Sequence, residues 1–192
     1  MNILTLNSQH LKLLFLFVGL SFASCSSNDD DAVTDPDNNK NQNAYSFTLA
    51  DNTYSNSWDL EEEYDDGAIS SIYRENEDGD KGISMTLSDQ KHEVVVSAGL
   101  SLENGQPLPL ADLSDEWDID STASSIIIII EGVNYISTSG TAKLSNLKTT
   151  MIIGNTGVAS YKLEIDGFFD NPNTAKQEQI KVKGTFQVQS GF

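Results

Sequence analysis

The chain has 192 residues, of which 29 are acidic and 11 are basic, giving a formal net charge of −18. A negative charge of this size repels the phosphates of nucleic acids, so we expect neither DNA nor RNA as a partner. The single cysteine excludes an internal disulfide, and the folded part must therefore be stabilised by its core.

The charge is distributed unevenly along the chain. The region from Cys25 to Glu131 holds 25 acidic and four basic residues, whereas the region from Gly132 to Phe192 holds four acidic and six basic ones. Such an asymmetry is typical either of an oriented or cation-binding surface or of an acidic half that keeps the protein soluble.

Residues 1–24 have the organisation of a secretory signal peptide. His10 and Lys12 precede the apolar run Leu13–Val18, and small residues follow that run. The run is shorter than the roughly 20 apolar residues that a membrane-spanning helix requires, so a retained transmembrane helix is the weaker alternative.

Ala23-Ser24-Cys25 resembles the bacterial lipobox, with Phe22 in place of the usual leucine. The resemblance implies that Cys25 receives a thioether-linked diacylglycerol and becomes the lipidated N-terminus after cleavage. Each buried CH₂ group contributes about 0.8 kcal/mol, so two or more acyl chains would anchor the protein stably in a membrane. A catalytic role for Cys25 would need a neighbouring base, and the sequence around it supplies none.

A polar and acidic cluster directly after this cysteine resembles the surface-export signal of Bacteroidota lipoproteins, which implies an outer-membrane protein that faces outward. The cluster consists of Ser26, Ser27, Asn28, Asp29, Asp30 and Asp31. It belongs to segment 25–43, whose composition is typical of a disordered linker spanning roughly 20–25 Å. A solvated linker without an export role is the alternative.

Apolar and polar residues alternate in the remaining segment, 44–192, which predicts half-buried strands. The expected inward positions are Tyr45, Phe47 and Leu49; Ile83, Met85 and Leu87; Tyr161, Leu163 and Ile165; and Ile180, Val182, Gly184, Phe186 and Val188. Turn signals such as Asp78-Gly79 separate these segments, and none has helical periodicity. We therefore predict a single all-β domain, an antiparallel β-sandwich, with a β-barrel as the alternative.

Five consecutive isoleucines, Ile126–Ile130, place β-branched side chains on both faces of one strand. This pattern predicts a central strand, or a strand near an edge that another surface covers. Asp118 and Asp120 before the run and Glu131 after it are charged residues of the kind that oppose aggregation.

Two segments in the C-terminal half resemble motifs of small Bacteroidota lipoproteins of uncharacterised function. They are Asn134–Leu144, which contains Ser139-Gly140-Thr141, and the later Gly184-Thr185-Phe186. The resemblance implies a β domain in the cell envelope but no activity.

No spacing of a nucleophile, a histidine and an acid stands out, so we predict no catalytic residues and no enzyme activity. His92 is the one histidine that follows the signal peptide, and we expect it to be an exposed strand residue. One histidine without a cysteine partner cannot form a structural zinc site.

Acidic loops and tryptophans provide the remaining candidates. Calcium takes six to eight oxygen ligands, and two segments are rich in carboxylates: Glu75–Asp80, and a loop with the candidate ligands Asp112, Asp115, Asp118 and Asp120. Trp58 and Trp117 are candidate glycan contacts, with core packing as the alternative. Two facing carboxylates would also serve glycoside hydrolysis.

The sequence thus favours a lipid-anchored β domain of the cell envelope with a non-enzymatic binding or structural role. Its expected partners are the membrane, through the anchor, and an envelope protein or polysaccharide. The alternatives are a calcium- or glycan-binding surface module and an acidic-pair glycoside hydrolase.

Overall fold

A computed structural model describes residues 42–59, 67–112, 122–174 and 179–190, and every regular element in these ranges is a β-strand. The all-β prediction is therefore confirmed. The predicted signal peptide, Cys25 and the polar segment up to residue 41 lie outside the described residues. The first strand begins at Gln42, slightly before the predicted start of the domain at Ala44.

The strands follow one another along the chain with short connections, as antiparallel neighbours allow. Their bounds are β1 (Gln42–Leu49), β2 (Asn52–Asp59), β3 (Gly67–Glu75), β4 (Lys81–Asp89), β5 (Val94–Glu103), β6 (Gln106–Pro107), β7 (Leu110–Ala111), β8 (Ser125–Ile130), β9 (Val133–Ile153), β10 (Thr156–Asp170) and β11 (Ile180–Val188).

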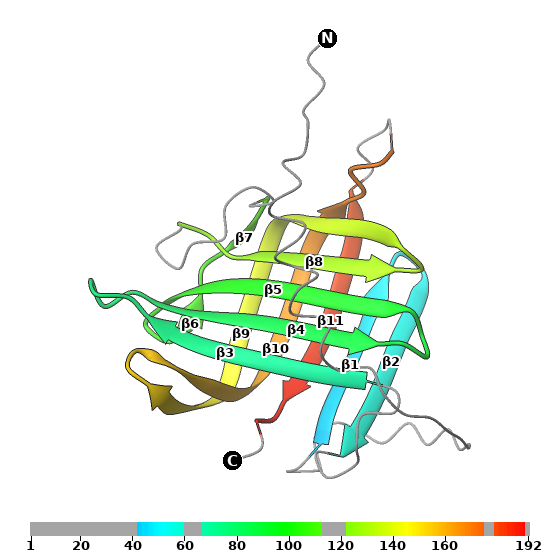
Figure 1. Cartoon of the computed structure of the whole chain (residues 1–192). Coiled ribbons are helices and arrows are strands. Elements are labelled where there is room, and N and C mark those ends of the chain that lie inside the picture. The colour runs from blue at the N-terminus through cyan, green and yellow to red at the C-terminus, as the bar shows by residue number, and fades with distance from the viewer. Residues whose placement is uncertain (1–41, 60–66, 113–121, 175–178, 191–192) are drawn as a thin grey trace, which may run out of the picture. The chain divides into compact units, whose positions relative to one another are not determined.

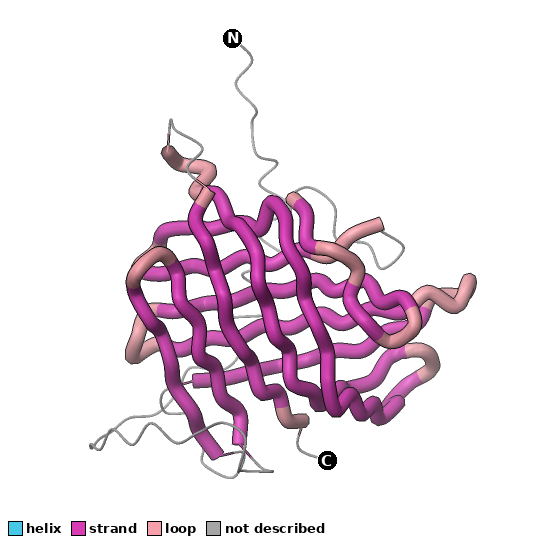
Figure 2. Tube along the Cα trace, turned by 180° about the vertical axis from the view of Figure 1, so that it is seen from behind, coloured by secondary structure: helices cyan, strands magenta, loops and turns pink. Residues whose placement is uncertain are grey.

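These strands form two layers whose directions cross (Figure 1). β3, β4, β5 and β8 lie in the front layer of that view, and β1, β2, β9, β10 and β11 lie in the layer behind it. Figure 2 shows the rear layer from the opposite side. Crossed layers are one of the two ways in which sheets pack face to face.

Both layers belong to one hydrogen-bonded sheet, in which all pairings between the named strands are antiparallel. At one side of the front layer, the first residues of β10, Thr156–Val158, pair with β3. At the other side, Ile127–Ile130 of β8 pair with β9. The fold is therefore sandwich-like, as predicted, but its layers share hydrogen bonds at two corners instead of being separate sheets.

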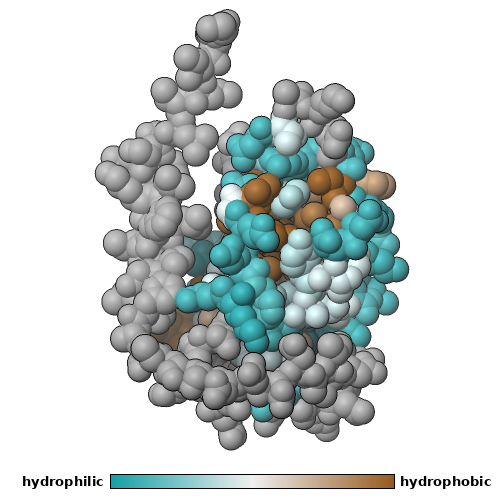
Figure 3. All heavy atoms as spheres, turned by 90° about the vertical axis from the view of Figure 1, so that its right-hand side faces the viewer, coloured by the Kyte–Doolittle hydropathy of each residue, from teal (hydrophilic) through white to brown (hydrophobic). Residues whose placement is uncertain are grey.

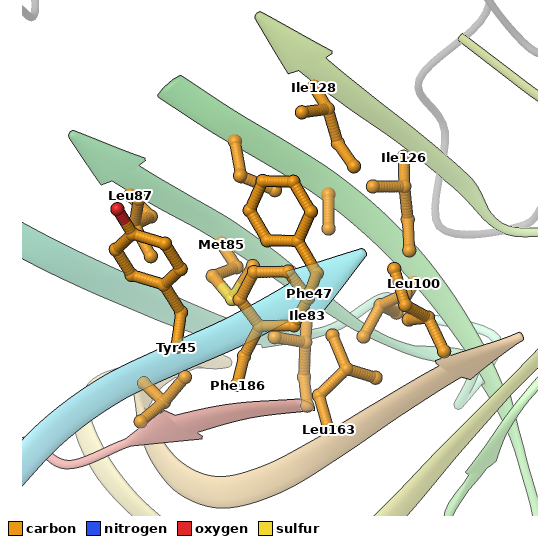
Figure 4. Close-up of a cluster of buried hydrophobic side chains, with 14 of the residues drawn as sticks. Tyr45, Phe47, Ile83, Met85, Leu87, Leu100, Ile126, Ile128, Leu163 and Phe186 are labelled. Carbon is orange, nitrogen blue, oxygen red and sulfur yellow. The ribbon is translucent and has the colours of Figure 1, made fainter. Parts of the chain in front are cut away.

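Apolar side chains from both layers fill the space between them (Figure 4). Tyr45 and Phe47 of β1 are 3% and 1% exposed, and Ile83 and Met85 of β4 are each 1% exposed. The ring of Phe47 also stacks on that of Phe186 of β11, with centroids 6.0 Å apart. The alternation on these strands thus predicted the core correctly, with Ile180 as a partly buried residue packed against its border.

The isoleucine run forms β8, which lies between β5 and β9. Ile126 and Ile128 are fully buried in the core, and Ile130 is 6% exposed. Ile127 and Ile129 point to the other face, where they are half-buried. The prediction of an interior strand is confirmed, and the run packs as core in the way its β-branched composition favours.

The glycines of the two C-terminal motifs lie where strands approach each other closely. Gly140 has a φ of +134° and lies opposite Gly167, and a Cβ on it would come within 2.6 Å of the Asp166 carbonyl oxygen. Gly184 lies opposite Phe47, and a Cβ on it would come within 2.8 Å of the Phe47 Cα atom. Both positions therefore require the absence of a side chain.

β9 has an outer edge that, beyond Gly140, pairs with no other strand among the described residues. Gln106 covers this edge at Leu144. The side-chain Nε2 of Gln106 donates to the Leu144 carbonyl oxygen at 3.0 Å, and its Oε1 accepts from the Leu144 N–H at 3.1 Å. The side-chain amide thus satisfies backbone groups as a neighbouring strand would.

Replacing Gln106 by alanine should remove both bonds and lower the free energy of unfolding by about 1 kcal/mol, because Leu144 loses a donor and an acceptor. Urea denaturation measures the change. Gln187→Ala, on an outward position of β11, is the matched control and should stay within about 0.5 kcal/mol. Equal stability of Gln106→Ala and the unchanged protein would contradict this role of Gln106.

Candidate functional site

A buried carboxylate joins the two layers at the end of β4. Asp89 is 1% exposed. Its Oδ2 accepts hydrogen bonds from the Tyr45 hydroxyl at 2.6 Å and from the Asn56 side-chain amide at 2.9 Å. Tyr45 and Asn56 lie opposite each other in the β1–β2 ladder. Their side chains therefore reach the same acid from the rear layer.

The turn between β4 and β5, residues 90–93, contributes two more contacts to this acid. The backbone N–H of His92 donates to Asp89 Oδ1 at 3.1 Å, and His92 Nδ1 lies 2.8 Å from Asp89 Oδ2. Glu93 follows with a φ of +51°, and its carbonyl accepts from the Glu131 N–H at 3.0 Å. The turn is thus bonded both to Asp89 and to the β8–β9 connection.

The protonation states of this cluster follow from burial and hydrogen bonding. Burial by itself raises the pKa of Asp89, but hydrogen bonds from Tyr45, His92 and Asn56 outweigh it and hold the pKa below its ordinary value. Burial and the bond to Asp89 both raise the pKa of Tyr45. At neutral pH the carboxylate therefore stays ionised and the phenol stays protonated, which makes their contact a charge-assisted hydrogen bond.

An acid and a histidine in contact are also two members of a hydrolytic triad, which needs a nucleophile at the second ring nitrogen. The side chain of His92 is 38% exposed, and its Nδ1 faces Asp89. Within the described ranges, no serine, threonine or cysteine is hydrogen-bonded to this ring. The geometry is suited to fixing a turn and joining two layers.

The sequence predicts His92 as an exposed strand residue, whereas the structure places it in the turn before β5. The reason is local, because an aspartate that accepts from the backbone N–H three residues later favours a turn over a continuing strand. The three-residue spacing of Asp89 and His92 could have indicated this turn from the sequence. Nothing in the sequence indicated the hydrogen bonds from Tyr45 and Asn56, which lie far from Asp89 along the chain.

The candidate glycan contact Trp58 is half-buried on β2. Its ring meets that of Tyr45 edge to face, with centroids 6.3 Å apart. A Cβ on Gly67 would lie 3.4 Å from the indole. Trp58 thus packs against the border of the core and keeps part of its surface exposed. Trp117 lies outside the described residues.

The candidate calcium ligands fall largely outside the described residues. Asp112 is exposed after β7, whereas Asp115, Asp118 and Asp120 belong to the undescribed range 113–121. In the part of the chain that the structure describes, no group of three or more histidines, cysteines, aspartates or glutamates could hold a metal ion.

In the acidic β3–β4 turn, the side chain of Asn76 forms hydrogen bonds with both the carboxylate and the backbone N–H of Asp80. Asn76 Oδ1 accepts from the Asp80 N–H at 2.8 Å, and Asn76 Nδ2 donates to Asp80 Oδ2 at 3.0 Å. The turn is therefore organised by hydrogen bonds of its own residues.

The β9–β10 hairpin ends in exposed apolar residues. Met151, Ile152 and Ile153 are 46%, 54% and 79% exposed, and Gly154-Asn155 forms the turn. A different view of the domain, from the side of β1 and β2, shows a mostly hydrophilic described surface with apolar side chains in its upper part (Figure 3). Among the described residues there is no helix with the length and apolar character needed to cross a membrane.

Comparison of the chain with protein-family models, with curated proteins and with solved structures finds no significant match.

Proposed function

We propose that this chain is a lipid-anchored protein of the bacterial cell envelope, with an outward-facing β domain at the outer membrane that has a non-enzymatic binding or structural role. The anchor is inferred from Cys25, the single cysteine, which directly follows an apolar leader and two small residues. Acyl chains on this sulfur would hold the domain at the membrane without a spanning helix.

The observation that carries the non-enzymatic role is the closed network around Asp89. A catalytic acid or base must reach the proton that it transfers. Both oxygens of Asp89 are instead occupied by Tyr45, Asn56 and His92. The network stabilises the connection between the two layers. This supports a structural role for Asp89 in a domain that binds a partner through its surface.

The anchor is tested by comparing the full chain with its Cys25→Ala variant in the producing bacterium. We expect the unchanged chain in the membrane fraction, with an N-terminal peptide whose mass includes acyl chains, and we expect protease added to intact cells to digest it. Cys25→Ala should lose the acyl mass. An unacylated Cys25, or a leader still attached, would refute the anchor.

The outward orientation is tested separately by replacing Asp29, Asp30 and Asp31 with alanine. The resemblance to an export signal predicts that this variant keeps its acyl chains but becomes resistant to external protease. Continued digestion at the unchanged rate would mean that these residues form a solvated linker only. Substrate turnover by the purified protein that a single carboxylate substitution abolishes would refute the non-enzymatic role.

A further inference from the structure

The end of the β9–β10 hairpin exposes three large apolar side chains to solvent, whereas turns on a protein surface are usually polar. We call Met151–Asn155 the hairpin tip. The exposed fraction of its side chains rises from 46% at Met151 to 79% at Ile153, toward the turn. Large exposed apolar groups that cluster in this way mark a surface that contacts something other than water.

The orientation of these side chains indicates what the contact is. Ile153 pairs with Thr156 and Met151 pairs with Gly157, with Ile152 as the extra residue of a β-bulge between these two pairs. Because neighbours in a strand point to opposite faces and paired residues share a face, Ile153 and Met151 lie on opposite faces of the hairpin. A strand that docks flat on a protein presents apolar residues on one face. A tip that is apolar on both faces is suited to being surrounded by an apolar medium, as at the acyl boundary of a bilayer.

The charges around the hairpin tip fit a zwitterionic surface. Between Glu131 and Glu164 the chain has three lysines and no acidic residue. Of these lysines, Lys148 is exposed and precedes the tip. On the other side, Asn155 accepts from the Glu75 N–H at 2.9 Å, which brings the tip beside the acidic β3–β4 turn. Headgroups with both signs of charge can satisfy both neighbours.

The hairpin tip lies toward the same end of the rear layer as Gln42, the first described residue. β1 and β10 are both antiparallel to β11, so Gln42 and Thr156 begin strands that run in the same direction. In the register of these strands, Ala44 is level with Lys162, and from that level back to Thr156 the strand curves toward β3, with which Thr156–Val158 pair (Figure 1). The 17 residues from Cys25 to residue 41 reach at most about 60 Å.

We propose that the hairpin tip inserts into the boundary between headgroups and acyl chains of the zwitterionic bilayer that holds the Cys25 anchor, a proposal that rests on the function proposed above. The domain then contacts the membrane at two points, one covalent and one reversible. Two contacts fix the orientation of the domain, which a single linker cannot do.

The test uses the acylated full-length mature protein with one introduced thiol. Because Cys25 is the single cysteine and its sulfur would be acylated, Ile153→Cys supplies one reactive site for an environment-sensitive fluorophore. Asp51→Cys is the matched control, since Asp51 is exposed in the β1–β2 turn at the opposite end of the rear layer. Both proteins are placed in phosphatidylcholine–phosphatidylethanolamine vesicles with lipids spin-labelled near the headgroup.

We expect a blue shift and quenching of the label at residue 153, and a water-like spectrum at residue 51. Adding Ile152→Ser to the Ile153→Cys protein should reduce the quenching, because a polar residue disfavours insertion. Vesicles of phosphatidylglycerol alone should quench less than the zwitterionic ones, because the acidic turn beside the tip is repelled.

The outcomes that overturn the proposal differ from those that overturn the anchor. A vesicle-bound, acylated protein with an unquenched label at residue 153 refutes the insertion and leaves the anchor standing. Self-quenching between labels without an effect of the spin-labelled lipids would mean that the tip binds a second copy of the chain, and also refutes it. An unacylated protein that stays in solution refutes both.

Discussion

Replacing Gly184 by alanine should lower the free energy of unfolding by about 3 kcal/mol or more, because the added methyl group has no space. A Cβ at this position would overlap the Phe47 Cβ and lie 2.8 Å from both the Phe47 Cα and the Ser46 carbonyl oxygen. These atoms belong to β1, so relief of the overlap requires β1 and β11 to move apart. The shift of the urea midpoint measures the loss.

The matched control for Gly184→Ala is Thr185→Ala, one residue further along β11. Thr185 is half-buried on the outward face and pairs with Ser46 of β1. Its replacement should change the free energy of unfolding by about 0.5 kcal/mol or less. If Gly184→Ala were as stable as this control, the close approach of β1 and β11 would be wrong.

Asp89→Ala should destabilise the domain by about 3 kcal/mol, because breaking a buried charged network leaves several polar groups unpaired. The Tyr45 hydroxyl and the Asn56 amide lose their acceptor, and the His92 N–H loses its bond in the turn. Chemical denaturation at neutral pH measures the effect. Tyr45→Phe should cost less, because it removes one donor and leaves the other bonds to Asp89 in place.

The same carboxylate predicts a dependence of stability on pH. Its pKa in the folded protein is below the ordinary value, so Asp89 contributes stability fully above the unfolded pKa of about 4, and this contribution is lost as the pH falls through the folded pKa. We expect the difference in stability between the unchanged protein and Asp89→Asn to be constant near neutral pH and to shrink in acid.

Asp166→Asn is the control for this titration. A hydrogen bond from Lys181 holds the pKa of Asp166 below its ordinary value, but Asp166 is on the outward face of β10. Because solvent screens an exposed ion pair, its removal should change the midpoint little at any pH. A difference between the unchanged protein and Asp89→Asn that stays constant into acid would show that Asp89 does not titrate as described.

The core could be predicted from the sequence because it depends on a local pattern. Alternation placed Phe47, Met85 and Leu163 inside without knowledge of which strands pair. The five isoleucines likewise identified β8, since a strand with both faces apolar must lie inside the sheet or be covered.

The crossing of the layers and the Asp89 network could not be predicted in this way. Tyr45 and Asp89 are 44 positions apart, and their contact depends on how β1 crosses β4. The sequence contained so many carboxylates that no single one could be distinguished as buried. The hairpin tip was missed because three apolar residues next to a turn look the same whether they are covered or exposed.

The pairing of the first strand with the last has a consequence for the order of folding. Asn43 and Gln189, 146 positions apart, are joined at 2.7 Å. Contacts between such distant residues slow folding, and a chain that emerges with its N-terminus first must wait for β11 before β1 finds its place. A chain arrested before Ile180 would leave the β1–β2 hairpin without the strand that connects it to β10. Final assembly would therefore follow complete emergence of the chain from the ribosome or from any transport channel.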